Sequence, residues 1–500
     1  MMSYNSNELR NLVVVMAISS LVAFAPSGVL AEQEPKEVAT SQGLFPLDER
    51  GLPEQKTIPA LFDEMDYQGA VQAYLWAMPQ MAIHGQRKMN EFYGTKGRLA
   101  LMTTYMDPSV YGFTTPNRVV RYIWNVYNFK EKGPMVMEMP GGQFVGLLMD
   151  YQMRFITDIG LTSKAGDNPE TIVFLGPNQS PPDEALAKGW RIERCRTNMS
   201  WLGLRILSPS CEDPSLVKKF RIYPWSQRKN PQPNPVFQAK PNDKIYYMAQ
   251  PRGMAYWEDL HEIIQQERVL DIDRYFMNSL KAVGIEKGKP FKPTKRQMDI
   301  LERAAYTGEK MAMAVSFVPR SEQSIYRKDT RWFLPLTLQP EHMTEYTQQF
   351  EERVAWTYTA CGVSPSMQAR VPGKGSTYFA AYHNADGDWL DGSKSYKFTV
   401  APNPPAAQMW VCSVYELENR SVIQNGEDQR TEISSLSKGL EANPDGSIDL
   451  YFGPEAPAGK ESNWIKTNKD ENWFVWFRLY APTEKYFDRS WPMNDIKEVK

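Results

Sequence analysis

The chain is 500 residues long, 42% hydrophobic and 23% charged, and its formal net charge is −2 at pH 7. This length exceeds what one hydrophobic core usually organises, which predicts two or three domains. The nearly balanced charge argues against the basic surface that nucleic-acid-binding proteins usually carry, so we expect no nucleic-acid partner.

An apolar run opens the chain over residues 12–25, and Pro26 follows it. Val29 and Ala31 then place small or medium-sized residues just before a polar stretch. This arrangement is typical of a secretory leader that is cut after Ala31. The run is shorter than the roughly 20 apolar residues of a membrane span. We therefore predict a signal peptide over residues 1–31 and a periplasmic or extracellular protein without a span once the leader is removed. An uncleaved anchor is the alternative, because Arg10 is the only Lys or Arg before the run.

Residues 32–60 are polar and rich in proline, which predicts a linker. A first β-rich domain with a flanking helix is expected over residues 61–223. Its helix, over residues 66–94, places apolar side chains on one face, and Pro79 predicts a kink or a break there. Strand-like patterns follow over residues 135–139, 144–149, 171–175 and 201–207.

Six prolines make residues 224–252 a connector without regular structure. A helical segment is predicted over residues 253–365. Its first helix covers residues 257–283 and ends at Gly284; a second begins at a capping box formed by Thr294 and Gln297. A third is predicted over residues 340–361.

Residues 366–500 carry period-two patterns, for example over residues 396–400 and 473–480, with Gly and Pro at the turns. This predicts an antiparallel, jelly-roll-like β-sandwich at the C-terminus. The fold class is therefore α+β, with β-rich domains at both ends of a helical middle.

Cysteine usage leaves the redox state open. Cys195 and Cys211 are near each other in sequence, and Cys361 and Cys412 flank the start of the C-terminal strands. Either pair could be bridged in an oxidising compartment, four cysteines allow three pairings, and buried free thiols are the alternative.

Metal motifs are weak. His261 begins half of a zinc-protease motif, but Gln265 stands where the second histidine is needed, which favours a surface helix. Asn384, Asp386 and Asp388 stand at alternate positions and Asp391 follows them, an arrangement of oxygen ligands that suits calcium, although a polar loop accounts for the same pattern. We expect no cofactor, with calcium at these aspartates as the alternative.

Familiar nucleophile and phosphate-binding motifs are missing, so whether the protein is an enzyme stays open. Carboxylates in a dry cleft can divide acid and base roles, and the candidates are Asp150, Asp158 and Asp386. Candidate ligand-binding residues lie at ends of predicted strands or among the C-terminal aromatics: Asn117, Tyr151, Arg154, Tyr382, His383, Trp410, Trp464 and Arg478. The alternative for the aromatics is core packing.

Two sets of spaced motifs resemble known domain families. Residues 66–76, Thr115-Pro-Asn117, Gly133-Pro134, Asp150-Tyr151 and residues 174–177 resemble DUF1254. Residues 430–440, 443–454, Asn463-Trp464 and residues 478–482 resemble DUF1214. The resemblance implies an exported bacterial protein with a β-rich N-terminal part, a helical middle and a C-terminal sandwich, and it implies no established activity.

Three hypotheses follow. The first is an exported binding protein that holds a small or oligomeric ligand, such as a glycan or an amphiphile, between its two β-rich domains. The second is a carboxylate-dependent hydrolase or lyase. The third is a structural or assembly protein of the cell envelope, and the sequence leaves open whether the protein forms a homo-oligomer.

Overall fold

A computed structural model describes residues 36–95, 98–105, 111–118, 120–207, 215–238, 244–368, 371–426 and 430–499. The predicted leader and Cys211 lie outside these ranges. The chain divides into two compact units, residues 1–64 and 65–500. In the first, where we predicted a linker, β1 (Glu37–Thr40) and β2 (Gly43–Pro46) form an antiparallel hairpin. Its turn is held because the Ser41 amide and hydroxyl donate to the Glu64 carboxylate, at 2.8 and 2.5 Å.

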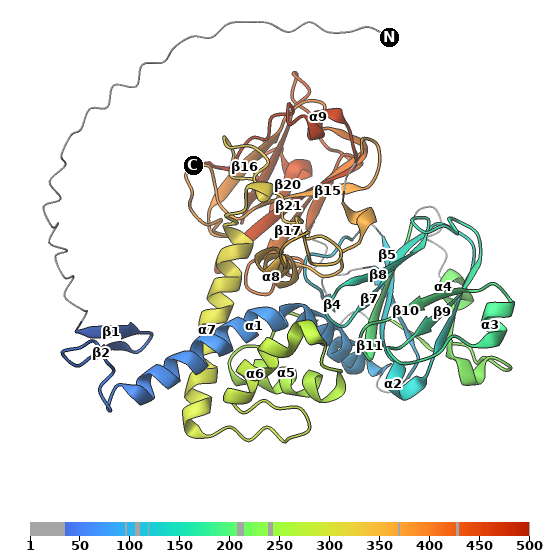
Figure 1. Cartoon of the computed structure of the whole chain (residues 1–500). Coiled ribbons are helices and arrows are strands. Elements are labelled where there is room, and N and C mark those ends of the chain that lie inside the picture. The colour runs from blue at the N-terminus through green and yellow to red at the C-terminus, as the bar shows by residue number, and fades with distance from the viewer. Residues whose placement is uncertain are drawn as a thin grey trace, which may run out of the picture. The chain divides into compact units, whose positions relative to one another are not determined.

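The N-terminal half of the second unit is a sandwich of two sheets (Figure 1). A six-stranded sheet has the order β13-β3-β5-β11-β7-β8, and a four-stranded sheet has the order β10-β9-β6-β12. The strands of these two sheets are β3 (Leu101–Tyr105), β5 (Arg121–Asn128), β6 (Met135–Met139), β7 (Phe144–Asp150), β8 (Phe155–Gly160), β9 (Glu170–Leu175), β10 (Arg191–Arg194), β11 (Met199–Ile206), β12 (Arg221–Pro224) and β13 (Val236–Phe237). Short helices α2 (Phe129–Lys132), α3 (Asp183–Ala187) and α4 (Ser215–Lys219) connect them. A separate parallel pair is formed by β4 (Tyr111–Gly112) and β14 (Tyr246–Tyr247). The strands predicted in this region are confirmed.

The six-stranded sheet is covered on both faces. On β11, Leu202, Leu204 and Ile206 point into the core between the two sheets. Met199 and Trp201 point the other way, into a second core that includes the helices. Because side chains alternate along a strand, one strand supplies both cores.

Helices form the middle of the unit and lie beside both sandwiches (Figure 1). They are α1 (Ile58–Asn90), α5 (Met254–Gln266), α6 (Arg274–Ala282), α7 (Lys295–Phe317) and α8 (Phe350–Thr359). The predicted break at Pro79 does not occur, since α1 continues to Asn90. Residues 77–83 of α1 are buried throughout, so packing outweighs the backbone hydrogen bond that proline cannot make.

Two helix predictions need correction. The single helix predicted over residues 257–283 is two helices, α5 and α6, because Glu267 is extended and its carboxylate binds the amides of Asn198 and Met199. The helix predicted over residues 340–361 begins only at Phe350. Before it, the Thr344 hydroxyl bonds to the backbone of Thr347, which competes with helix formation. The capping box of Thr294 and Gln297 is confirmed at the start of α7.

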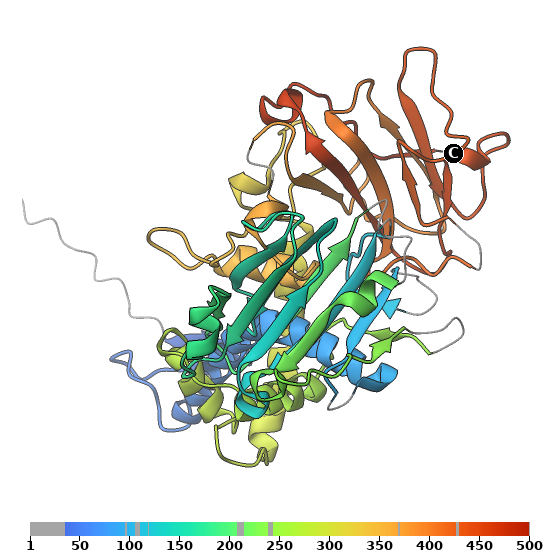
Figure 2. The ribbon, with the colours of Figure 1, turned by 90° about the vertical axis from the view of Figure 1, so that its right-hand side faces the viewer.

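The C-terminal part is a second sandwich, clear in Figure 2. Its sheets have the orders β15-β21-β17-β18 and β20-β19-β16-β22, antiparallel except for the parallel pair β19 and β20. The elements are β15 (Ser376–Ala381), β16 (Ser395–Val400), β17 (Ala406–Glu416), β18 (Glu432–Ser434), β19 (Ile448–Gly453), β20 (Trp464–Lys466), β21 (Trp473–Pro482), α9 (Glu484–Phe487) and β22 (Lys497–Val499). The α+β class with its antiparallel C-terminal sheet is thereby confirmed.

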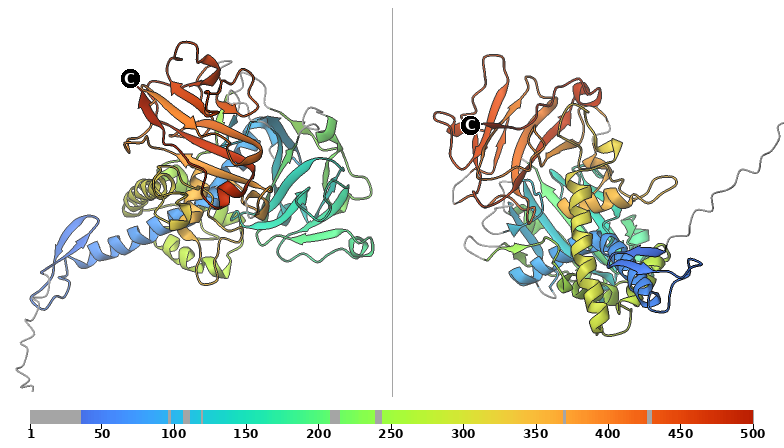
Figure 3. Two further views of the ribbon diagram at one scale, coloured as in Figure 1. Left: turned by 90° about the horizontal axis from the view of Figure 1, so that it is seen from above. Right: turned by 90° about the vertical axis from the view of Figure 1, so that its left-hand side faces the viewer.

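Strand β21 joins this sandwich to the rest of the unit. Val475 and Phe477 belong to the sandwich core. Phe474 and Trp476 face the helices, where Trp476 stacks on Trp356 of α8 with ring centres 5.8 Å apart. The two sandwiches therefore lie side by side with the helices against them, as Figure 3 shows from two further directions.

Candidate functional site

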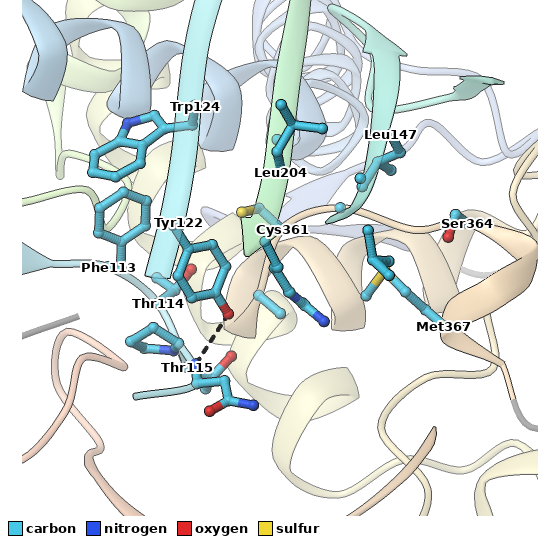
Figure 4. Close-up of a pocket in the computed structure, with 18 of the residues that line it drawn as sticks. Phe113, Thr114, Thr115, Tyr122, Trp124, Leu147, Leu204, Cys361, Ser364 and Met367 are labelled. Carbon is cyan, nitrogen blue, oxygen red and sulfur yellow. Dashed lines mark hydrogen bonds between the residues drawn. The ribbon is translucent and has the colours of Figure 1, made fainter. Parts of the chain in front are cut away.

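A cavity of about 90 Å³ lies at the junction of the two sandwiches and the end of α8. Strands β5, β7 and β11 form one wall, from which Figure 4 shows Tyr122, Leu147 and Leu204. Strands β15 and β21 of the C-terminal sandwich form another wall. The lining is mainly apolar and includes eight aromatic residues: Phe113, Tyr122, Trp124, Trp201, Trp356, Tyr378, Trp476 and Tyr480. Both sandwiches thus contribute aromatic rings to one cavity.

A short loop before β5 forms part of the wall. Thr115 has a φ of 40°, which is uncommon for a β-branched residue. Three hydrogen bonds hold it there: its amide donates to Arg420 O (2.8 Å), its hydroxyl to Thr359 O (2.8 Å), and its carbonyl accepts from Arg478 Nη2 (3.0 Å). Asn117 follows, and its side-chain amide donates to the Tyr480 hydroxyl. The loop therefore connects α8 and both sandwiches.

The end of α8 closes another side. Trp356 Nε1 donates to Gly362 O (3.0 Å), which fixes the turn that carries Cys361. Gln86 of α1 donates to the Cys361 sulfur (2.8 Å) and accepts from Trp201 Nε1. Burial raises the pKa of Cys361 to about 12. Cys361 is therefore a neutral thiol near pH 7, and a poor nucleophile.

Gly203 of β11 shapes the floor of the cavity. A Cβ at this position would lie 2.0 Å from Cη2 of Trp201. The glycine is therefore required for the indole of Trp201 to lie along the sheet, because any larger residue would displace the ring.

The charges in the wall have one sign. Arg205 of β11 and Arg478 of β21 line the cavity, and no carboxylate lines it within the described part of the chain. Arg478 is buried and has protein partners: it donates to Ser413 Oγ and Thr115 O, both at 3.0 Å. Its guanidinium carbon lies 5.2 Å from the centre of the Trp476 ring. The polar remainder of the lining is neutral, with hydroxyl and amide groups.

A more open groove adjoins the cavity. It measures about 280 Å³ and shares Met367 and Tyr378 with the cavity wall. Its polar lining is neutral: Gln323, Thr337, Gln339, Gln368, Ser376, Thr377 and the hydroxyl of Tyr486. Met367 therefore borders both spaces, and a methionine side chain is flexible.

Two of the eight predicted ligand-binding residues, Asn117 and Arg478, line the cavity. The other six lie elsewhere. Tyr151 is buried with its hydroxyl 3.0 Å from His84 Nδ1, and Arg154 lies 3.7 Å from Asp273. Tyr382 stacks on Phe474, Trp410 stacks on Phe477 in the sandwich core, His383 packs on Trp389, and Trp464 donates to Gly453 O.

The three predicted catalytic carboxylates occupy separate environments. Asp150 is buried at the end of β7 and accepts from the amides of Gln152 and Arg154, both at 2.9 Å. Asp158 lies behind the cavity wall, where Ser366 Oγ donates to it at 3.4 Å, and burial raises its pKa. Asp386 is on an exposed loop of the C-terminal sandwich. No two of them face each other across the junction cavity.

The described residues contain no group of three or more His, Cys, Asp or Glu placed to hold a metal ion. In the predicted calcium loop, Asp391 accepts from the amide and hydroxyl of Ser393, as in a turn. His261 Nε2 contacts the carbonyl of Lys289 and the amide of Gln265. Cys195, Cys361 and Cys412 are free thiols.

Arg205, Tyr122 and Trp201 are lining residues that sequence reasoning did not select. Their strands were predicted only in part, and no sequence signal tells which face of a central strand meets a cavity when both faces are covered. The alternation on β11 places Arg205 on the same face as Trp201 once that face is known.

Comparison with known families defines the class. Residues 97–223 match DUF1254 and residues 375–484 match DUF1214, both described as proteins of unknown function. The chain is a two-domain protein with a DUF1254 domain followed by a DUF1214 domain, and the junction cavity lies between these domains. No curated protein matches the sequence.

A solved structure has a similar fold. The VPA0106 protein from Vibrio parahaemolyticus is similar with a TM-score of 0.52 and 15% identity, over 87% of this chain and 100% of that one. A putative uncharacterized protein from Burkholderia cenocepacia gives a TM-score of 0.40 at 12% identity, over 88% of this chain and 96% of that one. Within the described ranges, no helix combines the length and apolar character that a bilayer span requires.

Proposed function

We propose that the protein binds a small amphiphilic molecule in the junction cavity, without chemical conversion. One observation carries this proposal: a mainly apolar cavity, rich in aromatic rings, whose walls come from two domains and also carry hydroxyl, amide and guanidinium groups. Ligand sites are commonly concave, apolar and located between domains. Among the described residues, the lining offers no carboxylate pair and no activated nucleophile, so binding accounts for this lining better than hydrolysis does.

The size of the cavity limits the ligand. Its volume of about 90 Å³ is below that of an engineered cavity of roughly 150 Å³ that binds benzene. The cavity therefore takes a short chain or one ring after slight widening. A longer ligand would extend past Met367 into the neutral polar groove, where hydroxyl and amide groups suit a hydroxylated portion such as a sugar.

Export is part of the proposal. The apolar run before Ala31 supports a leader that directs the protein to the periplasm or outside the cell. N-terminal sequencing of the mature protein from a bacterial host should begin at Glu32, and a protein that retains its first residues would contradict the leader.

A cavity-filling variant tests the binding function. Leu147 lines the cavity from β7, so Leu147→Trp adds bulk inside it. We expect benzyl alcohol, benzoate, hexanol or hexanoate to bind wild type with one saturable site in calorimetry and to change tryptophan emission. Binding by Leu147→Trp should be at least tenfold weaker, because the indole occupies the space.

Leu436→Trp is the matched control, since Leu436 is 70% exposed and the same substitution there leaves the cavity open. It should bind the probes as wild type does. The proposal fails if none of the four probes binds wild type, or if Leu147→Trp, shown to be folded by circular dichroism, binds them with unchanged affinity.

A further inference from the structure

The two arginines of the junction cavity differ in what holds them. Arg478 donates to Ser413 and Thr115 and lies among aromatic rings, so its role in connecting β17, β21 and the loop before β5 is complete without a ligand. Arg205 lies over Tyr122, with its guanidinium carbon 5.4 Å from the ring centre. Its electrostatic neighbours are the phenols of Tyr122, Tyr378 and Tyr480.

These phenols do not neutralise Arg205. Tyr122, the largest influence, raises the pKa of Arg205 above its ordinary value, so the guanidinium is a cation wherever the protein is folded. A phenol is neutral near pH 7. Among the described residues no carboxylate lines the cavity, so none is placed to accept from Arg205 inside it. The guanidinium has five N–H donors, more than one phenol oxygen can accept.

Arg205 is half-buried beside a mainly apolar cavity, and an accompanying anion stabilises a cation in such surroundings. Side chains alternate between the two faces of β11, so Arg205 and Trp201, four residues apart, both point to the side of the cavity. The aromatic walls supply contact for an apolar body, and the guanidinium supplies a fork that matches two oxygens of a carboxylate.

We propose that the ligand of the junction cavity is a small organic anion whose carboxylate or similar group binds Arg205, with its apolar body against the aromatic walls. This inference rests on the proposed binding function and names the charge of the ligand. Arg205 then determines the preference for an anionic ligand, and Arg478 holds β17, β21 and the loop before β5 in place around the cavity.

Matched probes test the charge directly. Benzoate and benzyl alcohol have the same ring and differ in charge, as do hexanoate and hexanol. We expect wild type to bind each anion at least tenfold more tightly than its alcohol at pH 7.5, measured by calorimetry. This comparison needs no variant, so it does not depend on the folding of a mutant.

Two substitutions locate the selectivity. Arg205→Met keeps the approximate length of the side chain and removes the charge; it should weaken benzoate at least tenfold and benzyl alcohol less than threefold. Arg205→Lys keeps the charge but not the fork, so it should retain part of the preference. Arg274→Met removes an equal charge from an arginine whose side chain is 72% exposed and should leave both affinities unchanged.

The outcomes separate the two proposals. Equal binding of benzoate and benzyl alcohol by wild type would overturn the organic-anion inference and leave the binding function standing. Anion selectivity that persists in Arg205→Met would overturn the role of Arg205. Failure of all four probes to bind would remove the binding function itself. A change in thermal stability of Arg205→Met without a change in selectivity would show that Arg205 only supports Tyr122.

Discussion

The surroundings of individual side chains decide their roles, as Arg205, Arg478 and Glu267 show. The two arginines line the cavity from different sandwiches: Arg478 donates to a neighbouring carbonyl and hydroxyl, whereas Arg205 has the phenol of Tyr122 beside it. A residue's type therefore sets its charge, and its neighbours decide whether that charge is available to a ligand.

Glu267 is 7% exposed, beyond the end of α5. Its two oxygens accept from the amides of Asn198 (2.7 Å) and Met199 (2.8 Å). Burial nevertheless raises the pKa of Glu267 to about 7, because the low-dielectric surroundings disfavour the charged form. Glu267 thus changes its charge close to neutral pH.

This shift predicts a pH-dependent stability. The pKa of Glu267 is higher in the folded protein than its ordinary value of 4.5, so the folded state binds the proton more tightly. The stabilising contribution is present below pH 4.5 and is lost as the pH rises through 7. We expect the free energy of unfolding of wild type to fall relative to Glu267→Gln by up to about 3 kcal/mol between pH 4.5 and 8, measured by urea denaturation.

Glu258→Gln is the control, because Glu258 is exposed on α5 and the substitution there removes an equal charge. It should change the free energy of unfolding by less than about 0.5 kcal/mol. A difference between wild type and Glu267→Gln that is constant with pH would contradict the raised pKa.

At the scale of elements, close packing explains a glycine inside a helix. Gly308 lies in α7, where its helix propensity is about 1 kcal/mol poorer than that of alanine. A Cβ there would lie 2.5 Å from Cδ1 of Tyr74 on α1. The glycine therefore lets α7 approach α1 closely, and α7 continues through it to Phe317.

Gly308→Ala should therefore destabilise the protein by about 1–3 kcal/mol, because the methyl group forces Tyr74 to move in a packed core. On an exposed helix surface the same substitution would stabilise by about 1 kcal/mol, so the sign of the change tests the packing. Thermal and urea unfolding give this sign directly.

Glu302→Ala, on the exposed side of the same helix, should change the free energy of unfolding by less than about 0.5 kcal/mol. A stabilised Gly308→Ala variant would mean that Tyr74 has room to move, and the close approach of the two helices would lose its support.

At the scale of the whole molecule, residues 65–500 form one compact unit although they contain two family domains. One hydrophobic core includes side chains from α1, from the six-stranded sheet and from β21. Tyr378, Phe474 and Trp476 of the C-terminal domain belong to it. The domains therefore share a core, and we expect them to depend on each other for stability.

Calorimetry of the protein should show one cooperative unfolding transition for residues 65–500. A fragment of residues 366–500 should bind a hydrophobic dye and aggregate, because removal of the partner exposes the aromatic face of β15 and β21. A soluble, monomeric fragment with a sharp transition of its own would show that the C-terminal sandwich is independent of the rest.

The sequence predicted the positions of helices and strands correctly where the local pattern of residues favours the same structure as the tertiary packing. The strands over residues 135–139 and 171–175 and the capping box at Thr294 are of this kind. The break at Pro79 was wrong because burial overrides a local preference. Among candidate site residues, Asn117 and Arg478 were selected from the sequence and lie in the cavity; Trp410 was selected for the same aromatic character and lies in the sandwich core.

The sequence by itself determined the alternation of side chains along each strand, the order of the two domains and the supply of aromatic residues near the C-terminus. Only the tertiary structure decided which side of β11 and β21 faces a cavity, and hence that Arg205 meets a space to which no described residue contributes a carboxylate. The physical reason is that both faces of these central strands are buried. Hydrophobicity then no longer distinguishes one face from the other, and the choice depends on contacts between residues far apart in the chain.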